Sequence, residues 1–209
     1  MKRLRLFFLI FTWGCSLKYS TGETRTVNIC VLNDVRAPIK DTSFVRKSIE
    51  AASSSYEENA EIVFRINEYH DYSGPIWKMT GMHSVLLDDT AINGVCDSSE
   101  IKTLFTNQSK KESLGFVYKG ALAEASGKLP VVIIFEAENP PIYLNSGEHP
   151  LSWLLIHEIG HLFMGPRAHS QDTLSFMYEY INKSYGQWTK HDKKNIILNK
   201  AKKFVASPN

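Results

Sequence analysis

The sequence predicts a mixed α/β domain, in which a sheet packs against helices. Two observations support this class. Short apolar or alternating runs typical of strands are interleaved with segments of helical periodicity. The chain of 209 residues is also 43% hydrophobic and 22% charged, which is ordinary for a globular protein. This composition excludes collagen-like, low-complexity and mainly disordered chains, and the length suits a single domain.

The first half of the chain contains the patterns that begin the predicted sheet. Apolar runs, or apolar and polar residues in alternation, predict strands at 26–32, 61–67 and 83–88. Between the first two strands, a helix with one apolar face is expected to end near Glu58. The polar stretch after the third strand is expected to be loop-rich, with one short helix at 99–106. The cap of the long helix has three candidates, which are Asp41, Thr42 and Ser43.

The second half predicts a hairpin followed by two helices. Residues 114–122 and 129–136 are predicted to be the two strands of the hairpin. Pro150 opens a helix over residues 151–163 that is apolar nearly all round, so this helix should be buried. A capping box that begins at Thr189 and ends at Asp192 predicts the start of a last helix. The residues expected along this helix are Ile196, Ile197, Lys200, Ala201 and Phe204.

The first residues have the layout of a secretory signal peptide. Basic residues precede an apolar run at 6–13, and small residues follow it. The run is too short to span a bilayer, which takes roughly 20 apolar residues. We therefore expect residues 1–16 to be removed, with cleavage no later than about position 22, and residues 24–209 to form one secreted domain. The alternatives are an uncleaved anchor and a lipoprotein cleaved before Cys15.

Removal of the signal peptide changes the meaning of the net charge. It takes away three of the 24 basic residues and none of the 22 acidic ones, so a net charge of +2 becomes −1. The chain also has no basic stripe with interleaved aromatic residues, so nucleic acid is not expected as a partner. A second apolar stretch is absent from the sequence, and no membrane span is expected once the signal is removed.

Secretion also affects how the cysteines and asparagines are interpreted. Cys15 lies in the signal, so the mature chain keeps Cys30 and Cys96. An oxidising compartment permits a disulfide between these two residues. Asn107 and Asn182 each begin a triplet that accepts N-glycosylation if the host is eukaryotic.

The segment His157-Glu158-Ile-Gly-His161 is an H-E-x-x-H motif on the predicted buried helix. Residues four apart lie on one face of a helix, so the two imidazoles can bind one metal ion. Glu158 lies beside them, where its carboxylate can take a proton from a water at the metal. The alternative is an ordinary helix with two surface histidines. The apolar residues around the motif disfavour it, because buried histidines and a buried glutamate are costly unless something pairs with them.

A hydrolytic zinc site needs a third protein ligand, and His169 follows His161 by eight residues, beyond Gly165. With this histidine the sequence resembles the metzincin clan of zinc peptidases, whose H-E-x-x-H-x-x-G-x-x-H motif is followed by a methionine turn. The chain has one extra residue before the glycine and one before the last histidine. Met177 and Tyr178 follow His169 at the distance found in matrixin-like families, and the predicted hairpin is similar to that of adamalysin-like metzincins.

The resemblance implies a fold and a role for each residue. The fold would be an α+β zincin with a mixed, mostly parallel five-stranded sheet and an antiparallel edge strand. It would also have an active-site helix, a methionine turn and a C-terminal helix. One zinc ion would be bound by His157, His161 and His169. Met177 would form the floor beneath the metal, and Tyr178 would shape the substrate pocket.

The remaining candidates have simpler interpretations. Asp192 would either anchor the last helix beneath the site or serve only the capping box. Arg167 would either contact substrate or lie exposed in a loop. The isolated histidines are expected to be surface or packed residues and not ligands; these are His70, His83, His149 and His191.

Together these features predict a secreted zinc endopeptidase that acts as a monomer on peptide or protein substrates. Glu158 would be the general base for hydrolysis and then the acid that protonates the leaving amine. The substrate would lie along an edge strand near 115–120. Two alternatives stay open. Glu179, 18 residues after His161, could be the third ligand, as in glutamate-type zincins. The chain could also be a secreted binding or effector protein on a peptidase scaffold.

Overall fold

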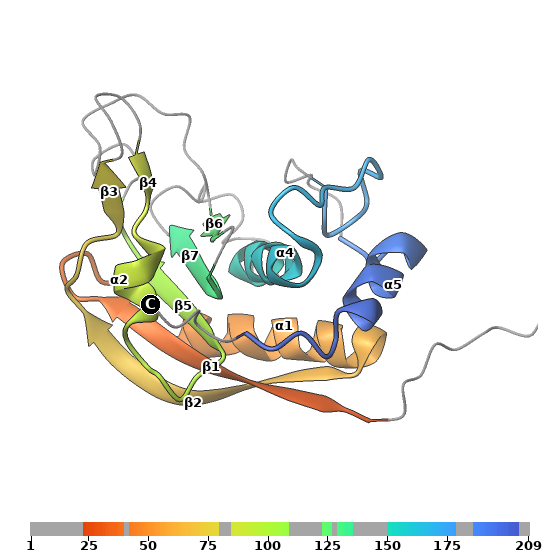
Figure 1. Ribbon diagram of the computed structural model, residues 1–209, viewed down its shortest axis with the longest axis horizontal. Helices are drawn as coiled ribbons and strands as arrows, with labels where there is room; N and C mark the ends of the chain where they lie inside the picture. Colours follow the sequence, from red (N-terminus) through yellow and green to blue (C-terminus); the bar gives the residue numbers. More distant parts are fainter. Residues whose placement is uncertain are drawn as a thin grey trace, which may run out of the picture.

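The computed structural model describes residues 23–39, 42–79, 85–108, 123–126, 129–135, 150–178 and 186–204 (Figure 1). The strands of its main sheet are β1 (Arg25–Asp34), β2 (Ile62–Tyr72), β5 (Ile101–Thr106), β6 (Ala123–Ala125) and β7 (Val131–Phe135). They lie in the order β2-β1-β5-β7-β6. The first four are parallel to one another, and β6 is antiparallel to β7. The α/β class predicted from the sequence is confirmed.

Each face of the sheet has its own hydrophobic core, because successive side chains of a strand point to opposite faces. On one face, β1 residues such as Val27 and Ile29 pack against the helices α1 (Ser43–Ala60), α4 (Pro150–Met164) and α5 (Lys190–Leu198). On the other face, Cys30 and Leu32 pack against α2 (Asp89–Asn93) and against Trp77 of a small ribbon. The ribbon consists of β3 (Trp77–Met79) and β4 (Val85–Leu87), which pair antiparallel.

Helix α4 lies on the same face of the sheet as α1 and α5, and it contacts α1, α5, β6 and β7 (Figure 1). Its apolar surface explains this position, since six residues around the motif are buried: Leu154, Leu155, Ile156, Ile159, Leu162 and Phe163. The burial predicted for this helix is confirmed. The motif is therefore held by packing from several elements.

The prediction of a short helix at residues 99–106 is wrong. Ile101–Thr106 forms β5, a central strand between β1 and β7, and all six of its side chains are buried. Lys102 gives this segment a polar composition that is unusual for a central strand. Its ammonium donates to Ser99 O at 2.7 Å, and burial lowers the pKa of Lys102.

Two other boundaries differ from those predicted. The strand expected at 83–88 is β4, which is shorter and belongs to the ribbon instead of the main sheet. Thr42, one of the three residues predicted as possible caps, is the N-cap of α1. Its side chain makes no capping hydrogen bond, however. The ribbon strand β3 and the helix α2 were not predicted.

The capping box of the last helix is confirmed, because Thr189 and Asp192 each accept from the other's backbone N–H. The helix ends at Leu198, however, so the prediction that it extends to Phe204 is wrong. Phe204 instead packs edge-on against Phe163 of α4, with ring centroids 5.0 Å apart. The segment after α5 is thus held against α4 by tertiary packing.

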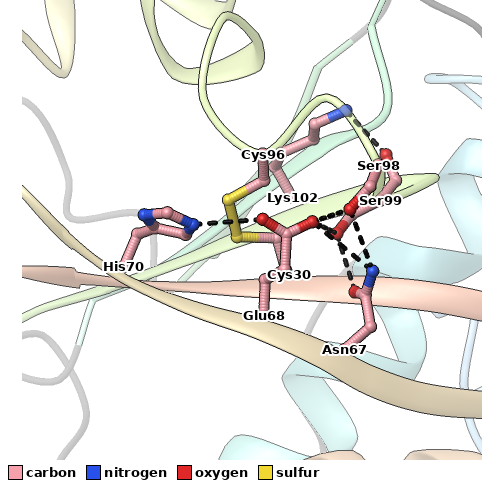
Figure 2. The surroundings of a disulfide bond; sticks show 8 residues. All are labelled: Cys30, Asn67, Glu68, His70, Cys96, Ser98, Ser99 and Lys102. Atoms are coloured by element: carbon pink, nitrogen blue, oxygen red, sulfur yellow. Dashed lines mark hydrogen bonds and ion pairs between the residues drawn. A yellow bond between two sulfur atoms is a disulfide. The ribbon is translucent and has the colours of Figure 1, made fainter.

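Cys30 of β1 and Cys96, which follows α2, are joined by a disulfide (Figure 2). The two cysteines of the predicted mature chain are therefore paired in this structure. Residues 1–22 and the strand predicted at 114–122 lie outside the described residues. Among the residues that are described, no helix is both long and apolar enough to cross a membrane.

Candidate metal centre

The H-E-x-x-H motif occupies the C-terminal half of α4. His157 and His161 project from one face of the helix, and their Nε2 atoms lie 3.0 Å apart. Glu158 is 8% exposed and His161 is 7% exposed, so the motif is largely withdrawn from solvent. Two imidazoles and a carboxylate are therefore placed together inside the fold.

His169 reaches the same point from the loop that follows α4. Gly165 has a φ of 106°, in the region that favours glycine, and its N–H bonds to His161 O at 2.8 Å as the helix ends. The His169 ring centroid lies 5.5 Å from that of His157 and 4.8 Å from that of His161. One ligand nitrogen from each ring lies within 4.8 Å of the others. The structure thus brings all three predicted ligands together.

Backbone carbonyl groups determine how two of the rings are turned. His157 Nδ1 donates to Phe176 O at 2.7 Å, and His161 Nδ1 donates to Gly165 O at 3.1 Å. A carbonyl can only accept, so each Nδ1 carries a proton and each neutral ring presents a bare lone pair at Nε2. Two lone pairs only 3.0 Å apart repel each other unless a cation lies between them.

A metal ion is a better fit for that cation than a proton. Burial and the neighbouring His161 lower the pKa of His157 to about 4, and burial also lowers the pKa of His161. Both rings are therefore neutral near pH 7, which is the form that binds metals. Zinc bonds of ~2.0–2.1 Å in a tetrahedral site hold two nitrogens roughly 3.4 Å apart. The separation in the structure is close to this, so the residues fit a zinc ion.

Met177 lies against the motif from the side of the following loop and is completely buried. A Cβ placed on Gly160 would fall 2.4 Å from Met177 Sδ and 3.4 Å from the hydroxyl of Tyr56. That hydroxyl donates to Ile156 O at 2.9 Å. The loop methionine and α1 therefore support the part of α4 that lies between the two histidines.

Asp192 connects this methionine loop to α5. Its Oδ2 accepts from Ser175 Oγ at 2.8 Å, and from the backbone N and Oγ1 of Thr189 at 3.1 and 2.6 Å. Ser175 Oγ accepts in turn from Met177 N at 2.9 Å. Asp192 thus serves the capping box and also positions the loop beneath the motif.

Several contributors to the site were missed by sequence reasoning. The carbonyl groups of Phe176 and Gly165 have no signal in the sequence, because every residue has one. Ser175 resembles any loop serine. Gly160 does have a signal, since a glycine inside a helix costs about 1 kcal/mol relative to alanine and is conspicuous in a buried one.

Among the residues that the structure describes, the group of possible ligands at this point contains His157, His161 and His169 and none of the other predicted residues. Tyr178 is half-buried directly after Met177, and its part in a substrate pocket stays a prediction. His70 and His191 are exposed and bond Glu68 and Asn195. The remaining residues are Arg167, which is exposed, Asn107, which is half-buried after β5, and His83, His149, Glu179 and Asn182, which lie outside the described residues.

A second group of possible ligands lies beside the disulfide: Glu68, His70 and Cys96 (Figure 2). The sulfur of Cys96 is already bonded to another sulfur. The Glu68 carboxylate accepts hydrogen bonds from Ser98 and Ser99 and pairs with His70 Nε2 at 3.1 Å. Its hydrogen bond from Ser98 is the main cause that lowers the pKa of Glu68. This group is a satisfied polar cluster.

Comparison with solved structures identifies the fold. The crystal structure of archaemetzincin from Methanopyrus kandleri, at 1.5 Å resolution, matches with a TM-score of 0.55 over 87% of this chain and 98% of that chain. The fold is archaemetzincin-like. At 15% sequence identity this similarity concerns the fold alone. No family model matches the chain, and no curated protein matches its sequence.

Proposed function

We propose that this chain is a secreted zinc-dependent endopeptidase of the metzincin type. The observation that supports this most is the meeting of His157, His161 and His169, with two bare Nε2 lone pairs 3.0 Å apart and a buried Glu158 next to them. The archaemetzincin-like fold supports the same assignment, because the name of that neighbour contains the clan that the zinc motif resembles. Secretion rests on the N-terminal signal pattern at residues 1–16.

The chain's own residues have distinct tasks in this proposal. A zinc ion bound by the three imidazoles would polarise a peptide carbonyl and make a water more acidic. Glu158 takes the proton from the attacking water and delivers it to the leaving amine. The carbonyl groups of Phe176 and Gly165 keep the two helix histidines in the tautomer that presents Nε2. The exposed ring of His169 leaves the site open on one side, where an extended peptide can enter.

Histidine is favoured over Glu179 as third ligand, because the ring of His169 is beside the other two. We therefore assign one zinc ion to three histidines. A matrixin-like or adamalysin-like affiliation, a monomeric state, glycosylation at Asn107 and Asn182 and a substrate contact by Tyr178 are retained as predictions within this proposal.

Metal content and peptide cleavage test the proposal together. The purified chain should contain about one zinc per molecule and cleave a denatured protein, and a chelator should abolish cleavage. Glu158→Gln should keep the zinc and lose cleavage, whereas His169→Ala should lose both. His191→Ala changes an exposed histidine that is not part of the three-histidine group, so it is the control and should alter neither.

Two results would contradict the proposal. If His169→Ala keeps its zinc, the third ligand is another residue. If the zinc-loaded protein cleaves no peptide bond in a library of unfolded substrates, the chain is a binding protein on this scaffold and not an endopeptidase.

A further inference from the structure

A small pocket opens immediately beside the candidate metal centre. It has a volume of about 90 Å³, which by the liquid volume of roughly 30 Å³ per water is the space of about three waters. His161 lines it, and the same residue faces His157 with its Nε2. Its other lining residues follow β6, precede β7, end or follow α4, or follow α5. They are Ser126, Leu129, Pro130, Leu162, Gly165, Pro166, Lys202, Lys203 and Phe204.

The formally charged side chains among the described lining residues of this pocket have one sign. Two lysines, Lys202 and Lys203, line it, and none of its described lining residues is an aspartate or a glutamate. The Lys202 ammonium donates to Leu162 O at 2.6 Å, at the carbonyl end of α4, and lies 5.8 Å from the centre of the Phe204 ring. These contacts hold one cation at the wall of the pocket, although an ammonium has three donors.

A third lysine close to these two in sequence, Lys200, has its charge compensated by a carboxylate. Lys200 is buried, and its ammonium pairs with the Glu61 carboxylate at 2.9 Å. Among the described residues, Lys202 and Lys203 have no carboxylate partner of this kind. Unlike Lys200, these two lysines therefore offer positive charge to a molecule that enters the pocket.

Apolar side chains also line the pocket. Among them are Leu129, Pro130, Leu162 and Phe204, which line the same pocket as the two lysines and His161. An anion with a short hydrocarbon stem fits this combination, because its methylenes contact the apolar wall while its charge meets the ammonium groups.

We propose that this pocket is a subsite for an aspartate or glutamate side chain of the peptide substrate, at one fixed position near the scissile bond. The inference rests on the proposed function, since a peptide bound with its carbonyl at the three histidines would place a nearby side chain beside His161. Lys202 and Lys203 are then the residues that determine specificity for acid.

Paired peptides that differ only by Glu or Gln at each position around the cleaved bond test this inference. The wild type should prefer Glu at one position, by about fivefold or more in kcat/KM for a partly exposed ion pair. In Lys202→Met/Lys203→Met the ratio should fall to about one, and in Lys203→Glu alone it should fall below one. Lys194→Ala, an exposed lysine on α5, is the matched control and should keep the wild-type ratio. The thermal unfolding midpoint and zinc content of each variant establish that it is folded.

The same peptides, measured by equilibrium binding to the zinc-loaded Glu158→Gln variant, separate this inference from the proposed function. Cleavage without preference for Glu at any position overturns the subsite and leaves the endopeptidase intact. Preferential binding of Glu peptides without any cleavage by the wild type keeps the subsite and overturns the endopeptidase. A preference that persists in the double methionine variant also overturns the role of the lysines.

Discussion

The part of the chain that the structure describes contains two groups of residues that could bind a metal, and they differ in how their atoms are already engaged. At the disulfide, Cys96 is bonded to sulfur, and the Glu68 carboxylate accepts from Ser98 and Ser99 and pairs with His70. At α4, carbonyl groups occupy only the Nδ1 atoms of His157 and His161, and this turns the remaining lone pairs toward each other. Proximity of ligand atoms is therefore not enough to define a site. The partners of the remaining atoms decide whether a cation is needed.

The largest effect expected from this difference is on metal binding. His157→Ala should reduce zinc affinity by more than about 100-fold, because it removes one of three ligands and the lone pair that faces His161. His70→Ala, which removes a histidine from the disulfide cluster, should leave zinc affinity unchanged. Competition with a fluorescent chelator measures both. Equal losses in the two variants would refute the contrast between the clusters.

The next largest effect concerns stability, and here a change at the disulfide matters more than a change at the metal centre. Replacing Cys30 and Cys96 together by alanine should lower the free energy of unfolding by about 4 kcal/mol, as expected for cross-linked residues 66 apart in sequence. Zinc affinity should not change, since the disulfide lies on the other face of the sheet. Urea unfolding under oxidising conditions measures the loss, with the reduced wild type as a second reference. A parallel loss of zinc would mean that the two regions are coupled.

A smaller loss is expected inside the metal region when Gly160 acquires a side chain. Gly160→Ala would place a Cβ 2.4 Å from Met177 Sδ, so the fully buried Met177 side chain must shift, at a cost of about 1–3 kcal/mol. Zinc affinity should fall as well, because the loop that bears Met177 follows directly from His169. Gly94→Ala is the control: its Cβ would lie no closer than 3.5 Å to any atom, and φ at Gly94 is −70°. Similar thermal shifts in both variants would show that Met177 does not restrain this position.

Features that depend on local sequence patterns could be predicted, and features that depend on distant parts of the chain could not. The H-E-x-x-H motif and the capping box at Thr189 are local patterns, and both were located correctly because a helix places residues four apart on one face. The strand β5 was missed because its identity depends on neighbours far along the chain. Lys102 and Thr103 are buried there only because β1 and β7 lie on either side.

The site itself was likewise predictable only where it depends on local sequence patterns. Its ligand types could be recognised, and His169 could be proposed from its spacing. The turn at Gly165 and the carbonyl partners of the histidines could not, because they depend on backbone conformation. The acid-binding role proposed for Lys202 and Lys203 was also hidden, since the last helix was expected to reach Phe204 but ends at Leu198.

The smallest predicted effect is on the pH dependence of the metal-free protein. The pKa of His157 is about 4 in the fold, whereas a free histidine titrates near 6.5, so the unfolded chain binds more protons between these values. Stability from this residue is complete above about pH 6.5 and is lost as pH falls toward 4. For a half-buried ring the loss should be about 1–2 kcal/mol. Urea unfolding of the chelated protein from pH 7.5 to 4.5 measures it, and metal-free His157→Ala should give a flatter curve. The disulfide cluster acts in the same direction, since the lowered pKa of Glu68 also removes stability in acid, but its contribution persists in that variant. Parallel curves for wild type and variant would mean that His157 is not held in its neutral form, and the argument from facing lone pairs would then fail.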